Sequence, residues 1–139
     1  MKANELMIGD WVMDGKNIAQ ITSITCDGII ETTFNESSNI EVIEPIPLTP
    51  EILEKIGFER CISSIIKTST SSVPVCKSNQ FADKEFGGNT RIIDMGIHGF
   101  TLITDVFGTT EKNKVNHIFY VHQLQHALRL CGIEKEIKL

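Results

Sequence analysis

The feature that most constrains this fold is the segment Ile118–Cys131, IFYVHQLQHALRLC, which fits a helix better than any other stretch of the chain. At the helical rotation of about 100° per residue, its apolar residues fall on one broad arc. The arc consists of Ile118, Val121, Leu124, Leu128 and Cys131, with Tyr120 and Ala127 at its margins. Gly132 follows where a left-handed helix cap is expected. The pattern predicts a helix over about 118–131 with one face packed on a core.

The opposite face of this helix is polar, and we expect it to point outward. It carries His122, Gln125, His126 and Arg129. Such a strip is either a recognition surface, since Arg and His donate to carboxylates or carbonyls, or a solvated helix face. Leu130 also lies away from the core arc. Either the C-terminal residues 133–139 fold back and cover it, or a partner does.

Residues 6–47 predict a meander of short strands. Asp14-Gly15 and Asp27-Gly28 supply the positive φ angles of tight hairpins. We expect strands at Asp10–Met13, Ile18–Thr25, Ile29–Phe34 and Ile40–Ile43. A meander this small must curl to bury its inner face.

The opening phrase Leu6–Val12, LMIGDWV, resembles the first strand of small barrels of the Src-homology-three or Tudor type. The resemblance implies a small curled barrel and says nothing of its ligand, because such barrels bind peptides, nucleic acids or nothing. Trp11, the only tryptophan, is either an aromatic platform for a partner or a packing residue.

A boundary follows the meander. Pro45 and Pro47 favour an extended crossing. Thr49 is a suitable N-cap and Pro50 a suitable first helical residue, and Gly57 can end a helix of about two turns. These signals divide the chain into a small β-barrel-like lobe, residues 1–48, and an α+β lobe, residues 49–139, unless the two share one core.

Residues 61–116 again predict strands. One antiparallel pair is expected at 61–69 and 73–77, followed by a polar loop over 77–89, a second pair at 90–95 and 100–107, and a connection over 108–116. The predicted fold class is therefore α+β, with a curled N-terminal meander, a short helix, an antiparallel sheet and a packed C-terminal helix.

Composition restricts the function. Residues 1–60 carry four Lys/Arg against eleven Asp/Glu, whereas residues 111–139 carry five against three. Because nucleic-acid affinity comes largely from Lys and Arg side chains that contact phosphates, this distribution disfavours nucleic-acid binding by the N-terminal part and leaves the C-terminal part as a possible binding region.

No segment has the apolar length of a signal peptide or a membrane span, so we expect a cytoplasmic protein. Its four cysteines contain no CxxC pair and are expected to be buried thiols.

The most suggestive chemical motif is His122 and His126, two histidines at i and i+4, a spacing that zinc proteases use. The residue after the first histidine is Gln123, which cannot act as the general base that a glutamate provides. A third ligand would have to be His117 or His98. The chain has no GxSxG, GxxxxGK[ST] or GxGxxG motif. The expectation is a non-enzyme without cofactor, with a metal-dependent enzyme on the histidine pair as an alternative.

Three phrases together, LMIGDWV at 6–12, PIPLTPEILEKIGF at 45–58 and YVHQLQ at 120–125, resemble short uncharacterised phage, prophage and mobile-element proteins of Bacteroidetes. The resemblance implies a setting and no activity. We therefore expect a non-enzymatic accessory protein that binds another macromolecule, most simply a protein, with a nucleic-acid-associated module as the alternative. The candidate contacts are His122, Gln125, His126, Arg129, Leu130 and Trp11. The oligomeric state is left open.

Overall fold

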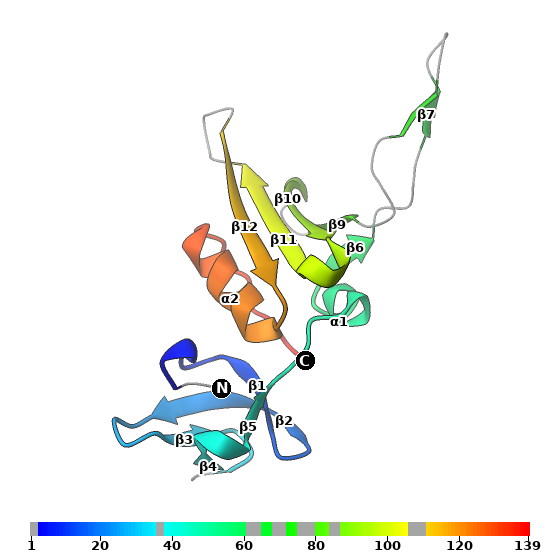
Figure 1. Cartoon of the computed structure of the whole chain (residues 1–139). Helices are drawn as coiled ribbons and strands as arrows, with labels where there is room; N and C mark the ends of the chain where they lie inside the picture. The colour runs from blue at the N-terminus through cyan, green and yellow to red at the C-terminus, as the bar shows by residue number, and fades with distance from the viewer. Residues whose placement is uncertain are drawn as a thin grey trace. The chain divides into compact units, whose positions relative to one another are not determined.

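The computed structural model describes residues 3–35, 38–60, 65–67, 72–74, 80–83, 87–105 and 111–139. Within these residues the structure is α+β, with two five-stranded antiparallel sheets, a two-stranded pair and two α-helices, which confirms the predicted α+β class (Figure 1). The chain forms two compact units. The first unit comprises Met1–Leu48 with Phe119–Leu139, and the second comprises Thr49–Ile118.

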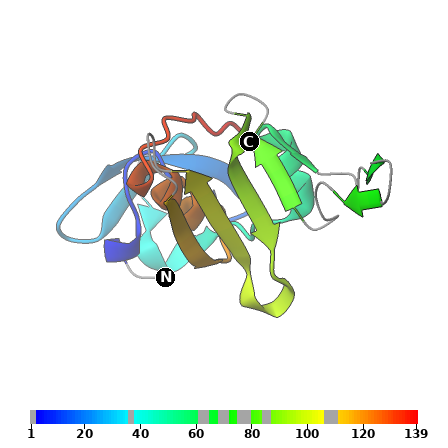
Figure 2. The same ribbon diagram turned by 90° about the horizontal axis from the view of Figure 1, so that it is seen from above.

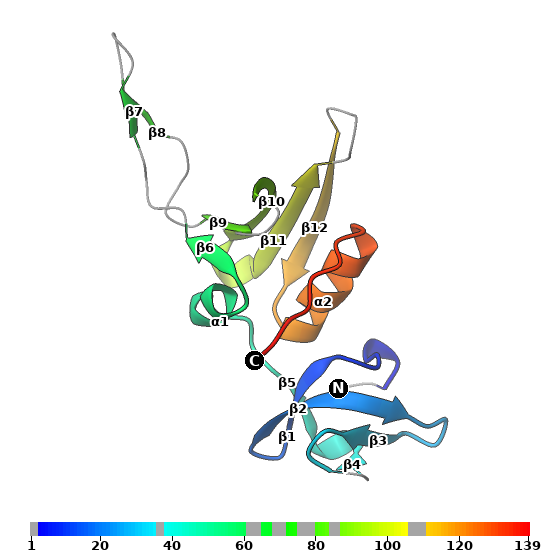
Figure 3. The same cartoon turned by 180° about the vertical axis from the view of Figure 1, so that it is seen from behind.

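The first unit contains a sheet of strand order β4-β3-β2-β1-β5, in which neighbouring strands are antiparallel (Figure 3). The strands are β1 (Trp11–Asp14), β2 (Asn17–Ile24), β3 (Ile29–Thr32), β4 (Ser38–Asn39) and β5 (Ile43–Pro45), with short 3-10 turns η1 (Ala3–Glu5) and η2 (Ile40–Val42). Both Asp-Gly pairs form the expected turns, since Gly15 has φ 63° and Gly28 has φ 82°. The predicted meander is therefore present, except that the strand expected at Ile40–Ile43 is replaced over Ile40–Val42 by the 3-10 turn η2.

The Src-homology-three or Tudor-like barrel is not confirmed, because the sheet does not close. Its edge strands β4 and β5 contain two and three residues, and neither pairs with the other. One face of the sheet nevertheless has its own apolar core. That core consists of Leu6, Val12, Ile21, Ile30 and Ile43, with Ile24 and Ile40 packed against it.

The C-terminal helix α2 (Val121–Leu130) belongs to the first unit, where it contacts β1. The sequence signals instead group this helix with residues 49–139. The difference arises at the point where the chain leaves and returns. There the Leu48 N–H donates to the Phe119 carbonyl at 2.9 Å, and the Val121 N–H donates to the Ile46 carbonyl at 2.9 Å. The second unit is thus an insertion between two adjacent segments of the first, and the boundary at residue 48 coincides with the predicted one.

The apolar arc of α2 is buried as predicted at Val121 and Leu124, which are fully covered, and at Leu128, which is 2% exposed. The helix is shorter than the predicted 118–131, because Ile118 ends a strand of the second unit and the half-buried Cys131 is the C-cap. Burying such an arc is what stabilises a helix of ten residues, because propensity alone is insufficient at that length. Gly132 has φ 73°, and its N–H donates to the Arg129 carbonyl at 3.0 Å. The left-handed cap at Gly132 is therefore confirmed.

The second unit begins with helix α1 (Pro50–Lys55). Thr49 is its N-cap, with Oγ1 accepting from the Ile52 N–H at 3.3 Å. An antiparallel sheet of order β12-β11-β10-β9-β6 follows, its strands side by side in Figure 2. Its strands are β6 (Phe58–Arg60), β9 (Gln80–Asp83), β10 (Gly87–Asp94), β11 (Phe100–Asp105) and β12 (Lys112–Ile118); β7 (Ile65–Lys67) and β8 (Ser72–Pro74) form the separate pair, and η3 (Gly96–His98) joins β10 to β11.

Strands β6, β9 and β12 were not predicted. Strand β12 lies at the sheet edge, and its residues before Ile118 are exposed or half-buried, so it lacks the alternation that marks a strand buried on one face. Its pairing with β11 shifts between Phe100 and Leu102, and His117 nearby has φ 59°. Such a bulge breaks the two-residue period further. The predicted strands at 61–69 and 73–77 lie partly outside the described residues.

Candidate functional site

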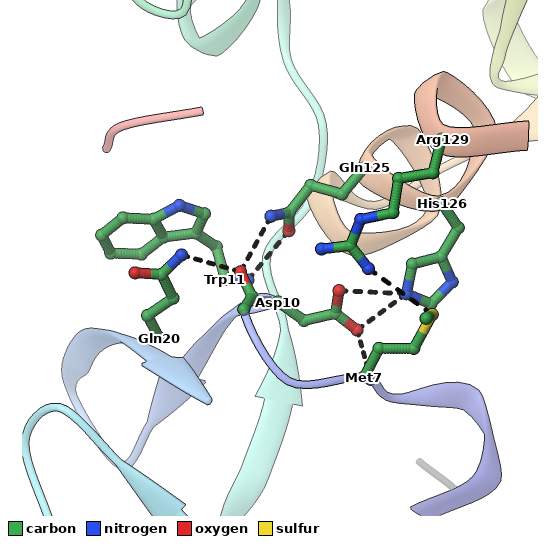
Figure 4. Close-up of polar contacts among 8 residues, drawn as sticks. Met7, Asp10, Trp11, Gln20, Gln125, His126 and Arg129 are labelled. Atoms are coloured by element: carbon green, nitrogen blue, oxygen red, sulfur yellow. Dashed lines mark hydrogen bonds and ion pairs between the residues drawn. The ribbon is translucent and has the colours of Figure 1, made fainter. Parts of the chain in front are cut away.

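Asp10 is the centre of a polar cluster between α2 and the turn that precedes β1. The Asp10 side chain is fully buried, yet its carboxylate has three polar contacts. Oδ2 accepts from the Met7 N–H at 2.7 Å. The His126 Nε2 lies 2.8 Å from Oδ2 and 3.0 Å from Oδ1 (Figure 4). A buried carboxylate is tolerated only with such partners, so these contacts fix α2 against the turn.

Gln125 makes a second connection from α2 to the same segment. Its Oε1 accepts from the Trp11 N–H at 2.9 Å, and its Nε2 donates to the Gly9 carbonyl at 3.0 Å. The Gly9 carbonyl also accepts from Gln20 Nε2 at 2.9 Å, so side chains from α2 and β2 meet there (Figure 4). One side chain therefore bonds two backbone groups at the start of β1 and in the turn before it.

The expectation that the polar face of α2 points outward is wrong for two of its four members. His122 is 3% exposed and Gln125 is 8% exposed. The His126 side chain is 25% exposed, and only Arg129 is an exposed residue. The turn at Met7–Asp10 covers this face. A direct contact of Gln125 with a partner would require α2 to leave that turn.

His122 is a buried histidine between two aromatic neighbours. Its ring stacks on Tyr120, with centroids 5.8 Å apart and planes 7° apart, and meets the His126 ring edge-on at 5.7 Å. Its Nδ1 has no hydrogen-bond partner among the described residues. Burial lowers the pKa of His122 from its ordinary 6.5, and His126 adds to that shift, whereas the carboxylates of Asp10 and Glu5 oppose it. His122 is therefore neutral at pH 7.

Gln123, which occupies the place of a protease glutamate, has a structural role. Its Oε1 accepts from the Phe119 N–H at 2.8 Å and from the Tyr120 N–H at 3.2 Å. It satisfies backbone donors ahead of the first turn of α2, which is the contribution of the third residue in a capping box. Helix capping explains an amide at this position.

The structure does not assemble a metal centre on the histidine pair within the described ranges. No group of three His, Cys, Asp or Glu side chains there has the arrangement to hold a metal ion. His126 Nε2 is already bonded to Asp10. His98 and His117, the expected third ligands, belong to the second unit, where His117 Nδ1 lies 3.3 Å from the His98 carbonyl oxygen.

Trp11 joins the C-terminal segment to the sheet. Its indole Nε1 donates to the Ile137 carbonyl at 2.7 Å, and Ile137 is buried. The half-buried Trp11 therefore acts as a packing residue here. This segment does not cover Leu130, which is 81% exposed, so the expected fold-back over Leu130 is wrong. Its residues turn toward Trp11 instead.

The Asp10–His126 pair resembles the part of a catalytic triad that orients a base. A nucleophile is missing from it: among the described residues, no hydroxyl or thiol is hydrogen-bonded to His126. The two described cysteines are free thiols, Cys131 half-buried and Cys26 exposed, so the expectation of burial is wrong for Cys26. Cys61 and Cys76 lie outside the described residues. The described cluster can position a helix, and it lacks the group that would attack a substrate.

The sequence motifs do not identify four members of this cluster, Asp10, Gly9, Gln20 and Met7. The one signal was an aspartate within the apolar phrase LMIGDWV, because a charged residue at such a place needs a buried partner.

Within the described ranges, no helix has both the length and the apolar character of a membrane span. Comparison with protein-family models, curated proteins and solved structures finds no match for this chain.

Proposed function

We propose that this chain is a non-enzymatic accessory protein of a phage or other mobile element, and that it acts by binding another protein. The observation that carries the proposal is an exposed apolar surface on the first unit. It comprises Met7, Ile8, Arg129 and Leu130, and is called the Met7–Leu130 patch. Met7 is 47%, Ile8 63% and Leu130 81% exposed.

The patch rests on a fixed backbone. The Arg129 Nη1 donates to the Met7 sulfur at 3.6 Å, and the turn that presents Met7 and Ile8 is bonded to Asp10. Protein-binding hot spots are enriched in arginine and lie in apolar surroundings, whereas scattered exposed apolar residues need no explanation. Here the Arg129 guanidinium touches one of the patch's apolar side chains directly.

The test is capture of a host-lysate partner by the full chain, with and without nuclease, followed by repetition with purified components. The informative variant is Ile8→Thr/Leu130→Thr, which removes apolar surface with a stability change within about 0.5 kcal/mol. The matched control is Ile18→Thr/Ile29→Thr, which removes similarly exposed isoleucines elsewhere on the first unit.

Protein binding through the patch is supported by a nuclease-resistant partner that is lost with Ile8→Thr/Leu130→Thr and kept with the control. A partner kept by both variants contradicts the proposal. A partner that nuclease removes, with affinity falling steeply with salt, supports the nucleic-acid alternative instead.

A further inference from the structure

A small pocket lies beside the first turn of α2, at the end of the helix away from Arg129. It has a volume of about 210 Å³ and is lined by Glu5, Pro45, Tyr120, His122 and Gln123. All five residues belong to the first unit. Cofactor and drug-sized ligands usually occupy about 300–1,000 Å³. The pocket therefore suits a single side chain better than a cofactor.

The pocket wall contains a buried group with unused hydrogen-bonding capacity. His122 is 3% exposed, and its Nδ1 has no partner among the described residues. Burial keeps the ring neutral by lowering its pKa, and a neutral imidazole has one nitrogen that accepts a hydrogen bond. Tyr120, stacked on His122, adds an aromatic surface. The wall therefore combines an aromatic surface with a neutral imidazole.

The charge at the pocket favours a cation. Glu5 is an exposed carboxylate in the pocket wall, and both Glu5 and Asp10 act on His122 in the direction that stabilises positive charge. An anion at the helix start would find few donors, because the Phe119 and Tyr120 N–H groups are bonded to Gln123 and the Val121 N–H to Ile46.

The net charge of the first unit also favours a cationic ligand. The residues of the first unit include five Lys/Arg and ten Asp/Glu, whereas those of the second unit include eight of each. The net charge of −5 therefore belongs to the first unit. A field of this sign accelerates association with a basic surface.

We infer that this pocket receives a lysine or arginine side chain of the protein partner, with Glu5 pairing the cation and the Tyr120–His122 stack forming the wall. The inference rests on the proposed function, and it names the partner chemistry at a second place on the first unit. A free amine metabolite presents the same cation, so the test separates a side chain within a protein from an amine alone.

The first experiment uses side-chain analogues on the ¹⁵N-labelled full chain at pH 7.5 and constant ionic strength. n-Butylammonium and n-propylguanidinium are titrated against 1-butanol, which has similar apolar bulk and no charge. We expect saturable shifts of the Tyr120 and Gln123 amide signals with the cations and none with the alcohol. Shifts that do not saturate, or that 1-butanol reproduces, overturn the inference.

The matched variants are Glu5→Gln and Glu31→Gln, each of which removes one negative charge at an exposed carboxylate of the first unit. Glu5→Gln should weaken the cations about 3- to 10-fold, the range for loss of one partly exposed carboxylate partner, and Glu31→Gln should leave them nearly unchanged. Equal effects of the two variants would show general charge attraction and overturn the pocket assignment.

The purified partner separates this inference from the proposed function. A partner that weakens with Glu5→Gln and not with Glu31→Gln supports both. A partner lost with Ile8→Thr/Leu130→Thr but unaffected by Glu5→Gln supports the proposed function and overturns the side-chain pocket. If cations bind at the pocket but the affinity for the partner is unchanged in both Glu5→Gln and Ile8→Thr/Leu130→Thr, the proposed function is contradicted. The pocket is then assigned to free amines.

Discussion

The Nε2 of His126 lies 2.8 Å from Oδ2 of Asp10, a carboxylate 116 residues away in the chain and fully buried. The pair joins the last helix to the turn before the first strand. Because Nε2 must carry a hydrogen to bond a carboxylate, His126 is a donor in this contact. The bond therefore exists with neutral or protonated His126.

The first prediction concerns the coupling of this pair. Asp10→Ala should destabilise the chain by about 3 kcal/mol, because it leaves the Met7 N–H and His126 without their acceptor. His126→Ala should cost less than Asp10→Ala, since its side chain is 25% exposed. In a double-mutant cycle by urea unfolding, the coupling energy should be about 1–2 kcal/mol. Additive effects would mean that the contact contributes nothing.

The second prediction compares one substitution at two neighbouring glutamines of α2. Gln125→Glu removes the donor to the Gly9 carbonyl and buries a second carboxylate near Asp10, so it should cost about 2–3 kcal/mol. Gln123→Glu keeps an acceptor for the Phe119 and Tyr120 N–H groups and adds negative charge at the helix start, which should be neutral or slightly stabilising. Thermal unfolding measures both, and equal losses would contradict the assigned roles.

The third prediction tests the orientation of α2. Leu128 is 2% exposed, so Leu128→Ala should destabilise by about 2–5 kcal/mol as a core truncation. Arg129→Ala should cost little, because Arg129 is exposed and contacts Met7 only through a weak sulfur acceptor. Small and equal shifts in the melting curves would show that this helix face is not buried in solution.

The fourth prediction is a pH dependence of stability from His122. Burial lowers its pKa in the folded state below 6.5. Between the folded and unfolded pKa values, the unfolded chain binds more protons, so stability rises with pH. The stabilisation should be complete above about pH 7.5 and fall as pH decreases through the unfolded pKa of about 6.5 toward the lowered folded value.

Urea unfolding followed by the fluorescence of Trp11, the only tryptophan, measures this effect because both Trp11 N–H groups are bonded to other parts of the first unit. His122→Phe preserves an aromatic ring beside Tyr120 and should reduce the slope between pH 5.5 and 7.5. The control His98→Asn/His117→Asn alters exposed histidines of the second unit and should retain the slope. A slope unchanged in His122→Phe would assign it to another group.

Local patterns predicted what local physics determines. The apolar arc of α2, the Thr49 cap, the Gly132 cap and the Asp-Gly turns depend on residues within about one or two turns of each other. Edge strand β12 escaped prediction because its exposed residues show no two-residue period. Strand β6 escaped prediction for another reason, because its three residues are too few to show a period.

The polar face of α2 could not be assigned from its own sequence. A helix carrying His122, Gln125 and His126 has the same sequence pattern whether water or buried protein groups form the hydrogen bonds of these side chains. The partners here are Asp10, Gly9 and the Trp11 N–H, all more than 100 residues distant. Satisfaction of buried polar groups is a tertiary property, so one sequence pattern is compatible with both outcomes.

The insertion of the second unit between Leu48 and Phe119 also sets an order of events on the ribosome. Residues 49–118 are contiguous, so they can begin to pack as soon as they emerge. The first unit must wait for residues 119–139, which synthesis at about 5–20 residues per second delivers several seconds after residue 48. Until then Asp10 lacks His126 and stays hydrated, and β1 meets α2 only after the whole second unit has been synthesised.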